Sequence, residues 1–402
     1  MQTLNMTAAN IVSKFKEVDE NNLIGVSDKL SLLKTKAIYG ANASGKSNLI
    51  KALSAFISIV EKSVKEDTIL KHKIESFILS TETEKKPTFF QLSFLLNGIL
   101  YRYGFEATRY EVVSEWLFGT PGKKEVPFFT RERNKINVND KQFKEGSKVI
   151  ALYRQTENDI ARGNSLFLTA VRSIFGGLAK EIVEFISEII IVNGLSDYYL
   201  YKNAEEALDD KVKRKNMLKL LSIADTGIET LSKAEWETNE EGETKKHKAA
   251  LTGHQKYDAK LKKVGAVNFF MSLSESEGSR KIFELSPFIL KSLEERKPIV
   301  IDEFDARIHP LLTKRIVELF NSKENKGSQF IFATHDTNLL EAKLLRRDQI
   351  CFVEKDKYGA SHFYTLAEFK GVRNDSSFEK DYISGRYGAI PFLGDFNSLI
   401  KE

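Results

Sequence analysis

Short apolar runs alternate along the chain with segments in which apolar residues recur every three or four positions. Residues 37–39 form an apolar run that predicts a buried strand, and apolar side chains follow at helical spacing over residues 49–60. Further along, residues 297–305 and 329–336 predict two more strands, with a helical pattern over residues 312–320 between them. This alternation predicts an α/β fold with a mostly parallel sheet covered by helices.

A second kind of strand pattern occurs between residues 89 and 107. The apolar segments "FFQLSFLL" and "LYRYGFEA" lie on either side of Asn97 and Gly98, a dipeptide that favours a tight β-hairpin. The sequence therefore predicts antiparallel strands in addition to the parallel ones, and a fold in which the strands are mixed.

The middle of the chain carries two further patterns. Over residues 171–189 apolar side chains follow one another at spacings of four and three, which is compatible with a coiled-coil seam or with a helix packed in a small helical subdomain. Residues 236–263 are dense in both signs of charge and predict an exposed hairpin or a mobile loop. We therefore divide the chain into residues 1–118, an inserted and mainly helical region over residues 119–264, and residues 265–402.

Composition constrains the function only weakly. A chain of 402 residues can bury a large core, and its net charge of +5 is too small to indicate nucleic-acid binding by itself. The single cysteine, Cys351, excludes an internal disulfide and is expected to be a packed core residue in a reducing compartment. Signal-peptide and membrane-spanning patterns are absent, and no histidine lies at metal-ligand spacing, so we expect a cytoplasmic protein without a structural zinc site.

The segment "GANASGKS", Gly40 to Ser47, has two glycines separated by four residues and followed by lysine and serine. Between a strand and a helix this pattern is typical of a phosphate-binding loop, whereas a Gly/Ser-rich surface turn is the alternative. The loop amides and the helix N-terminus would bind a phosphate chain, Lys46 would reach its outer phosphates, and the Ser47 hydroxyl would bind Mg²⁺. The sequence thus predicts ATP with Mg²⁺ as the cofactor, contacted by Gly40, Ala41, Asn42, Ala43, Ser44, Gly45, Lys46, Ser47 and Asn48.

Three side chains at predicted strand ends complete the candidate chemistry. Asp302 and Glu303 end the apolar run "IVIDE", where Asp302 would hold the metal and Glu303 would orient and deprotonate the attacking water. His335 follows the next predicted strand, and it would sense the terminal phosphate because neighbouring parallel strands end beside the same ligand. Lys46, Glu303 and His335 are therefore the candidate catalytic residues.

The segment "LSESEGSRK" precedes another predicted helix. Ser276, Gly278 and Ser279 would lie at its N-terminus, where serine and glycine can bind phosphate. A serine-rich helix cap without ligand explains the same residues.

Taken in order, these motifs resemble the ATP-binding-cassette superfamily, and within it the SMC and RecF-like ATPases. "GANASGKSN" is similar to the Walker A loop, "SEGS" to the signature motif, "IVIDEFD" to Walker B, "ARIHP" to the D-loop and "ATHD" to the switch histidine. "IYGANASGKSNLIKAL", "ESEGSRK", "DEFDARIHP" and "YISGRYGAIPFLGD" further resemble the bacterial abortive-infection ATPases of the RloA/AbiL type, relatives of the ATPase of the PARIS antiphage system. The signature lacks the usual Leu-Ser-Gly-Gly-Gln/Glu wording, and no Q-loop glutamine is found, since Gln91 lies inside a strand pattern.

The resemblance implies an ABC-ATPase head with a mixed sheet, whose two lobes flank the inserted region. It also implies a homodimer or higher homo-oligomer in which ATP is held by Lys46, Ser47, Asp302 and Glu303 of one copy and closed over by Ser276 and Gly278 of the other. The implied activity is Mg²⁺-dependent ATP hydrolysis in an antiphage defence system. The stretch after His335 is too short for a nuclease domain, so the effector is expected to be a separate protein.

Three other functions compete with this one. A RecF/SMC-like DNA-repair ATPase would need a basic groove for DNA. A transporter's nucleotide subunit would leave the long insertion unexplained, and a small-molecule kinase would leave "SEGS" and His335 without a role. At the C-terminal end, Arg373, Arg386 and Tyr387 would serve either partner docking or completion of the fold.

Overall fold

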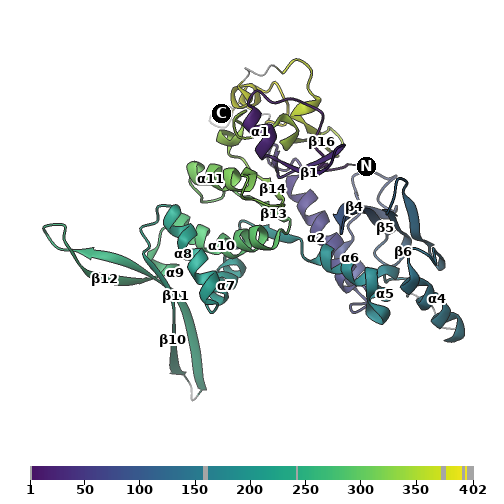
Figure 1. Ribbon diagram of the computed structural model, residues 1–402, viewed down its shortest axis with the longest axis horizontal. Coiled ribbons are helices and arrows are strands. Elements are labelled where there is room, and N and C mark those ends of the chain that lie inside the picture. Colours follow the sequence, from purple (N-terminus) through teal and green to yellow (C-terminus); the bar gives the residue numbers. More distant parts are fainter. Residues whose placement is uncertain (1, 157–161, 241–242, 373–376, 392–393, 396–402) are drawn as a thin grey trace, which may run out of the picture. The chain divides into compact units, whose positions relative to one another are not determined.

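The computed structural model describes residues 2–156, 162–240, 243–372, 377–391 and 394–395. Its contacts divide the chain into two compact units (Figure 1), the first formed by residues 1–47 and 190–402 and the second by residues 48–189. Helix α2 (Lys46–Lys62) starts at the end of the first stretch and continues into the second unit.

The first unit is built on a six-stranded sheet in the order β16-β15-β3-β14-β13-β9. Neighbouring strands are parallel, except that β15 and β16 are antiparallel. This confirms the α/β fold with a mixed sheet around a phosphate-loop core. The strands are β3 (Thr35–Tyr39), β9 (Ile190–Asn193), β13 (Ile299–Asp302), β14 (Phe330–Ala333), β15 (Ile350–Lys355) and β16 (Ser361–Thr365).

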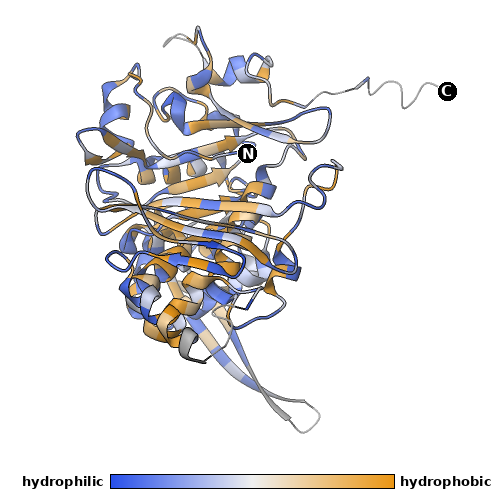
Figure 2. Cartoon of the chain, turned by 90° about the vertical axis from the view of Figure 1, so that its right-hand side faces the viewer, coloured by the Kyte–Doolittle hydropathy of each residue, from blue (hydrophilic) through white to orange (hydrophobic). Residues whose placement is uncertain are grey.

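The register of this sheet brings the functional motifs to one edge. Ala333 of β14 pairs with Ile38 of β3, and Phe332 of β14 pairs with Ile301 of β13. The carboxyl ends of these three parallel strands therefore lie side by side, and ligands of α/β sheets bind at this edge. All residues of β3 and β13 are buried, as expected for parallel strands covered on both faces, and Figure 2 shows strands coloured mainly as hydrophobic.

Helices and short strands complete the first unit. Four phenylalanine rings pack together in its core. The ring centroid of Phe330 lies 4.6 Å from that of Phe320, 4.6 Å from that of Phe332 and 5.0 Å from that of Phe304. The elements are α1 (Lys16–Asn21), β1 (Leu23–Ser27), β2 (Leu30–Leu33), α7 (Asp197–Ala207), α8 (Lys211–Ile223), α9 (Met271–Ser274), α10 (Glu277–Glu295), α11 (Pro310–Asn321), η1 (Thr337–Leu339), η2 (Arg347–Gln349), η3 (Leu366–Glu368) and α12 (Phe378–Ile383).

A separate three-stranded antiparallel sheet, which we name the arm, also belongs to this unit. It consists of β10 (Thr230–Glu240), β11 (Glu243–Tyr257) and β12 (Lys263–Phe270) in the order β10-β11-β12. The exposed-hairpin prediction for residues 236–263 therefore agrees with the structure, with residues 241–242 outside the described range. Leu231 and Ala250 anchor the base of the arm in the hydrophobic core.

The second unit holds a five-stranded antiparallel sheet in the order β4-β5-β6-β7-β8. The predicted hairpin is confirmed, since Asn97 and Gly98 between β4 and β5 have φ of 51° and 77°, as a tight primed turn requires. Its elements are α3 (Ile69–Lys73), β4 (Thr88–Leu96), β5 (Ile99–Ala107), β6 (Val112–Thr120), β7 (Val126–Glu132), β8 (Lys135–Val138), α4 (Lys144–Thr156), α5 (Phe167–Phe175) and α6 (Gly177–Ser187).

The heptad-like segment forms two packed helices rather than a coiled coil. Helices α5 and α6 are separated at Gly176 and Gly177, whose φ angles are 71° and 62°. Left-handed backbone at two successive residues ends a helix, and glycine adopts it without steric cost.

The three-region division of the chain stays a prediction. Its boundaries at residues 118 and 264 fall inside strands β6 and β12. Within the described ranges, every helix falls short of the length and apolarity that a bilayer span requires.

Candidate nucleotide site

The phosphate loop, Gly40 to Ser47, connects β3 to α2 and is closely packed. A Cβ at Gly40 would lie 2.5 Å from the Val353 carbonyl oxygen, and a Cβ at Gly45 would lie 2.2 Å from Ser361 Oγ. Gly45 also has φ of +114°, and the Ser361 hydroxyl donates to the Ser44 carbonyl at 2.7 Å. Both glycines are therefore required by the shape of the loop, as the motif predicts.

Lys46, the first residue of α2, is buried inside this loop. Its Nζ donates to the carbonyl oxygens of Gly40 at 2.8 Å and Ala41 at 3.2 Å. Burial lowers the pKa of the Lys46 amine, and the charges of Glu303, Asp302 and Asp305 partly offset this shift. The structure thus brings Lys46 under the electrostatic influence of three carboxylates that follow β13.

Asp302 and Glu303 lie at the end of β13, as the sequence predicts. Asp302 is buried, and its Oδ1 has no hydrogen-bond partner among the described residues. Glu303 is half-buried and has φ of +52°, a left-handed conformation that is rare for a residue with a Cβ. Backbone strain of this kind persists where the surrounding structure imposes it.

Gly194 holds the end of β13 from the neighbouring strand. Its N–H donates to the Asp302 carbonyl at 2.8 Å, directly after β9. A Cβ at Gly194 would lie 2.4 Å from the Glu303 carbonyl oxygen, so only glycine allows the two backbones to approach this closely.

His335 follows β14 with its ring exposed. Its backbone N–H donates to both carboxylate oxygens of Asp305, at 3.2 and 3.3 Å. Asp336 is buried and accepts from the Thr313 hydroxyl at 2.7 Å, and its carbonyl accepts from the Tyr39 hydroxyl at 3.0 Å. The residue before the phosphate loop and the residue after His335 are therefore joined directly.

The serine-glycine segment caps α10 as expected for a helix N-terminus. Ser276 Oγ accepts from the backbone N–H of Ser279 at 3.1 Å and lies 2.9 Å from its Oγ. A Cβ at Gly278 would contact the Arg307 carbonyl oxygen at 3.4 Å. Within the described part of the chain, these residues make no hydrogen bond to the phosphate loop, so the structure places them beside the segment after Glu303 instead.

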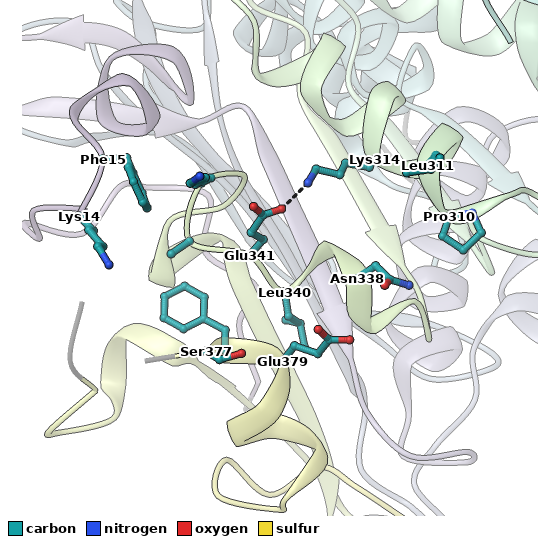
Figure 3. A pocket seen from close by; sticks show the side chains of 13 residues that line it. Lys14, Phe15, Pro310, Leu311, Lys314, Asn338, Leu340, Glu341, Ser377 and Glu379 are labelled. Carbon is teal, nitrogen blue, oxygen red and sulfur yellow. Dashed lines mark hydrogen bonds and ion pairs between the residues drawn. The ribbon is translucent and has the colours of Figure 1, made fainter. Parts of the chain in front are cut away.

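A pocket with a volume of about 470 Å³ lies beside the turn that follows His335 (Figure 3). Lys314 and Glu341 form an ion pair across it, and Glu379 on its wall accepts from the Thr337 hydroxyl at 3.0 Å. Thr337 lies two residues after His335, so this bond joins the pocket wall to the turn that follows β14.

The C-terminal residues complete the fold. Tyr387 is buried, packs its ring 5.7 Å from Phe352 and donates its hydroxyl to Asp381 at 2.8 Å. Arg386 is bonded to the same carboxylate at 3.1 Å. Arg373 lies outside the described residues.

The donor set fits a magnesium nucleotide. Ser44 Oγ and Asp302 Oδ1 are buried polar atoms with no hydrogen-bond partner among the described residues. The loop backbone packs so closely on Val353 and Ser361 that a side chain at Gly40 or Gly45 would clash. Ser47 and Asp302 would supply hard oxygen ligands, which Mg²⁺ prefers, and Mg²⁺ in such sites takes few protein ligands beside phosphate and water. Correspondingly, no cluster of three or more metal-ligating His, Cys, Asp or Glu occurs in the part of the chain that the structure describes.

Sequence reasoning missed four residues of this site. Asp305 had a signal, being the third carboxylate of "DEFD", but its bond to the His335 backbone depends on the approach of two strand ends. Gly194, Tyr39 and Asp336 had none, because their roles arise from strand order rather than local pattern.

A glycine-shaped loop between a central parallel strand and a helix, facing strand-end carboxylates, defines a P-loop α/β protein. The chain belongs to the family described as "AAA domain, putative AbiEii toxin, Type IV TA system", which matches residues 37–341. No curated protein matches the sequence.

Many solved structures are similar to this chain, and three of them are SMC heads. An SMC head bound to the C-winged helix domain of ScpA is 16% identical over 83% of this chain and 92% of that chain, with a TM-score of 0.39. The SMC head domain from Thermotoga maritima is 16% identical over 85% and 96%, with a TM-score of 0.38. An SMC head domain with an extended coiled coil, bound to the C-terminal domain of ScpA derived from Pyrococcus furiosus, is 15% identical over 89% and 95%, with a TM-score of 0.34.

Proposed function

We propose that the protein is an ATP-hydrolysing switch of a bacterial antiphage, abortive-infection system, in which ATP-dependent dimerisation controls a separate effector. One observation carries the ATPase part: Lys46, Asp302 and Glu303 converge at the carboxyl ends of β3 and β13, the two parallel strands on either side of β14. The motif resemblance to RloA/AbiL-type ATPases supports the defence role. So does the family description, which names a toxin of a toxin–antitoxin system.

In this proposal the loop amides and Lys46 hold the triphosphate, while Ser47 and Asp302 hold Mg²⁺. Bound Mg²⁺ supplies charge neutralisation on the phosphate oxygens. Glu303 orients the attacking water and accepts its proton, and its strained backbone is of the kind that clusters at active sites. His335 senses the terminal phosphate through its exposed ring.

The dimer part of the proposal assigns Ser276, Gly278 and Ser279 to the nucleotide of a second copy. Ser276 is exposed at the N-terminus of the 19-residue helix α10, so a phosphate could approach it from outside. A ligand that contacts both copies only in the closed state stabilises that state by its differential affinity.

The proposal is tested with Glu303→Gln, which removes the proton acceptor and keeps the shape of the side chain. We expect this variant to bind ATP, to hydrolyse it at least about 100-fold more slowly and to accumulate as a dimer with ATP, because general-base catalysis contributes about 10²–10⁴-fold. ATP binding by equilibrium dialysis and mass by light scattering measure the two properties separately.

Glu318→Gln is the matched control, since Glu318 lies on α11 and pairs with Arg315 away from the site. Wild-type hydrolysis is expected for this control. Loss of both ATP binding and dimerisation in Glu303→Gln, with the control intact, would contradict the assignment.

The same Glu303→Gln dimer tests whether the partner of the switch is a separate effector protein or DNA. An effector-controlling switch is expected to leave duplex DNA unbound at 150 mM salt. Salt-dependent DNA binding that strengthens with ATP would instead support the RecF/SMC-like alternative.

A further inference from the structure

The two edges of the arm differ in how they are protected. An uncovered sheet edge can pair with another chain, and natural sheets prevent this with charged residues or proline. Strand β10 carries four charged residues in "TLSKAEWETNE". In β12 only the first residue, Lys263, is charged, and residues 264–270, "VGAVNFF", contain neither charge nor proline.

The unprotected edge is also exposed. Seven of the eight residues of β12 are exposed, with Val264 at 55% and both Phe269 and Phe270 at 40%. Within the described residues only β11 pairs with β12, and Figure 1 shows β12 on the outside of the arm. The register of β11 and β12 is irregular at Val264, because Lys256 pairs with Gly265 and Tyr257 with Lys263. The outer backbone groups of the regular, uncharged residues 265–270 are thus available for a further strand.

We propose that β12 pairs with β12 of a second copy in antiparallel orientation, which joins the two arms into one six-stranded sheet without nucleotide. In the register that we infer, Val267 lies opposite itself on the twofold axis. Gly265 then lies opposite Phe269 of the second copy, and Ala266 lies opposite Asn268.

Self-complementarity identifies a second copy as the occupant. When a strand pairs with its own copy, like charges on opposite residues destabilise the pair. In this register no like charges lie opposite each other. A Cβ at Gly265 would meet no atom within 4 Å, and an aromatic side chain across from an edge glycine covers such a gap. Gly265, Val267 and Phe269 alternate onto the same face, so each Phe269 covers the opposite Gly265.

The contact is expected to be weak alone. Five paired residues on each side, 265–269, bury less than a standard interface, so we expect a dissociation constant on the order of 10 µM. Strand β12 leads through α9 directly to Ser276. The pairing therefore gives each copy a contact in addition to the nucleotide-bridged one and independent of it.

Disulfide trapping tests the register. Val267→Cys is made in a Cys351→Ser background, because Cys351 is the only native cysteine. Directly opposite antiparallel residues have Cα atoms about 4.5–5.5 Å apart, which suits a disulfide, so mild oxidation without nucleotide should give a covalent dimer. Val264 is 55% exposed and so more accessible than Val267, the one half-buried residue of β12. Its two copies would lie about 20 Å apart along the strands, so Val264→Cys should stay monomeric.

Sedimentation velocity from 5 to 200 µM tests the association itself. Val267→Lys would place two lysines opposite each other, so its dissociation constant should rise at least about tenfold. Trp236→Lys adds the same charge on the opposite edge strand, β10, where Trp236 is 42% exposed, and it should associate like the wild type. Circular dichroism confirms that each variant is folded.

A monomeric wild type over this concentration range would overturn the proposal. Equal trapping of the cysteines at 264 and 267 would do so too, as would undiminished association of Val267→Lys. A failure of the ATPase proposal can be told apart from a failure of this one. In that case ATP would have no effect on the protein, but the association without nucleotide would remain.

Discussion

Gly194→Ala tests whether close backbone packing positions the carboxylates after β13. The added Cβ would lie 2.4 Å from the Glu303 carbonyl oxygen and 2.7 Å from that of Asp302. Both neighbours are main-chain atoms, which cannot rotate away as a side chain would. Since an ordinary carbon–oxygen contact is about 3.3 Å, the two segments must separate by about 1 Å.

Two magnitudes follow from this displacement. Adding one methyl group to a well-packed site typically costs about 1–3 kcal/mol of unfolding free energy. A displacement of about 1 Å at a catalytic group costs about 100-fold in rate. We therefore expect urea unfolding to show a loss of about 1–3 kcal/mol, and steady-state ATP hydrolysis to fall about 100-fold at 25 °C.

Gly25→Ala provides the control. A Cβ at Gly25, in β1 of the same unit, would meet no atom within 4 Å, and its φ is not in the left-handed region. Replacing such a glycine is neutral or stabilises by up to about 1 kcal/mol, through the unfolded state. If Gly194→Ala matched Gly25→Ala in both stability and turnover, the positioning argument would be refuted.

Three further predictions concern buried polar groups. Burial lowers the pKa of Lys46 in the folded protein below its unfolded value of 10.5. At any pH below the folded pKa, burying the charged amine therefore destabilises the ligand-free fold by its full amount, and this penalty disappears as the pH rises past 10.5. Lys46→Met should thus be thermally more stable than the wild type at pH 7 and lose this advantage toward pH 10. Burial raises the pKa of Cys351 to about 11, so at pH 8 only about one thiol in a thousand is ionised, and Ellman's reagent should react far more slowly than in urea. Arg346→Ala should cost about 3–5 kcal/mol in urea unfolding, because it leaves the buried carboxylate of Asp348 without its partner.

Local patterns predicted the parts of the site that local chemistry determines. The phosphate loop and the Asp302–Glu303 strand end are each encoded within ten residues. The spacing of apolar residues also predicts the strands and the helix that flank them, β3, α2 and β13. Their convergence also followed, because parallel strands end at the same edge. These elements needed no knowledge of which strand neighbours which.

Features that depend on distant partners could not be predicted in this way. Gly194 matters only because β9 pairs with β13, and β9 lies at the edge of the sheet far from the phosphate loop in sequence. The apolar spacing over residues 171–189 suggested one continuous helix, although the pair Gly176 and Gly177 was the signal for a break. Periodicity records which face is apolar, and it does not record where the backbone turns.

The segment from Glu303 to His309 connects every part of the proposed switch. Asp305 binds the backbone of His335, and Arg307 pairs with Asp197 at 2.7 Å. The Arg307 carbonyl oxygen lies 3.4 Å from the position that a Cβ on Gly278 would take. Both Glu303 and Arg307 hold positive φ, so this short segment is constrained at two points. If Glu303 orients the attacking water as we propose, a change at its carboxylate can reach the Ser276 helix cap and His335 through the backbone of this one short segment.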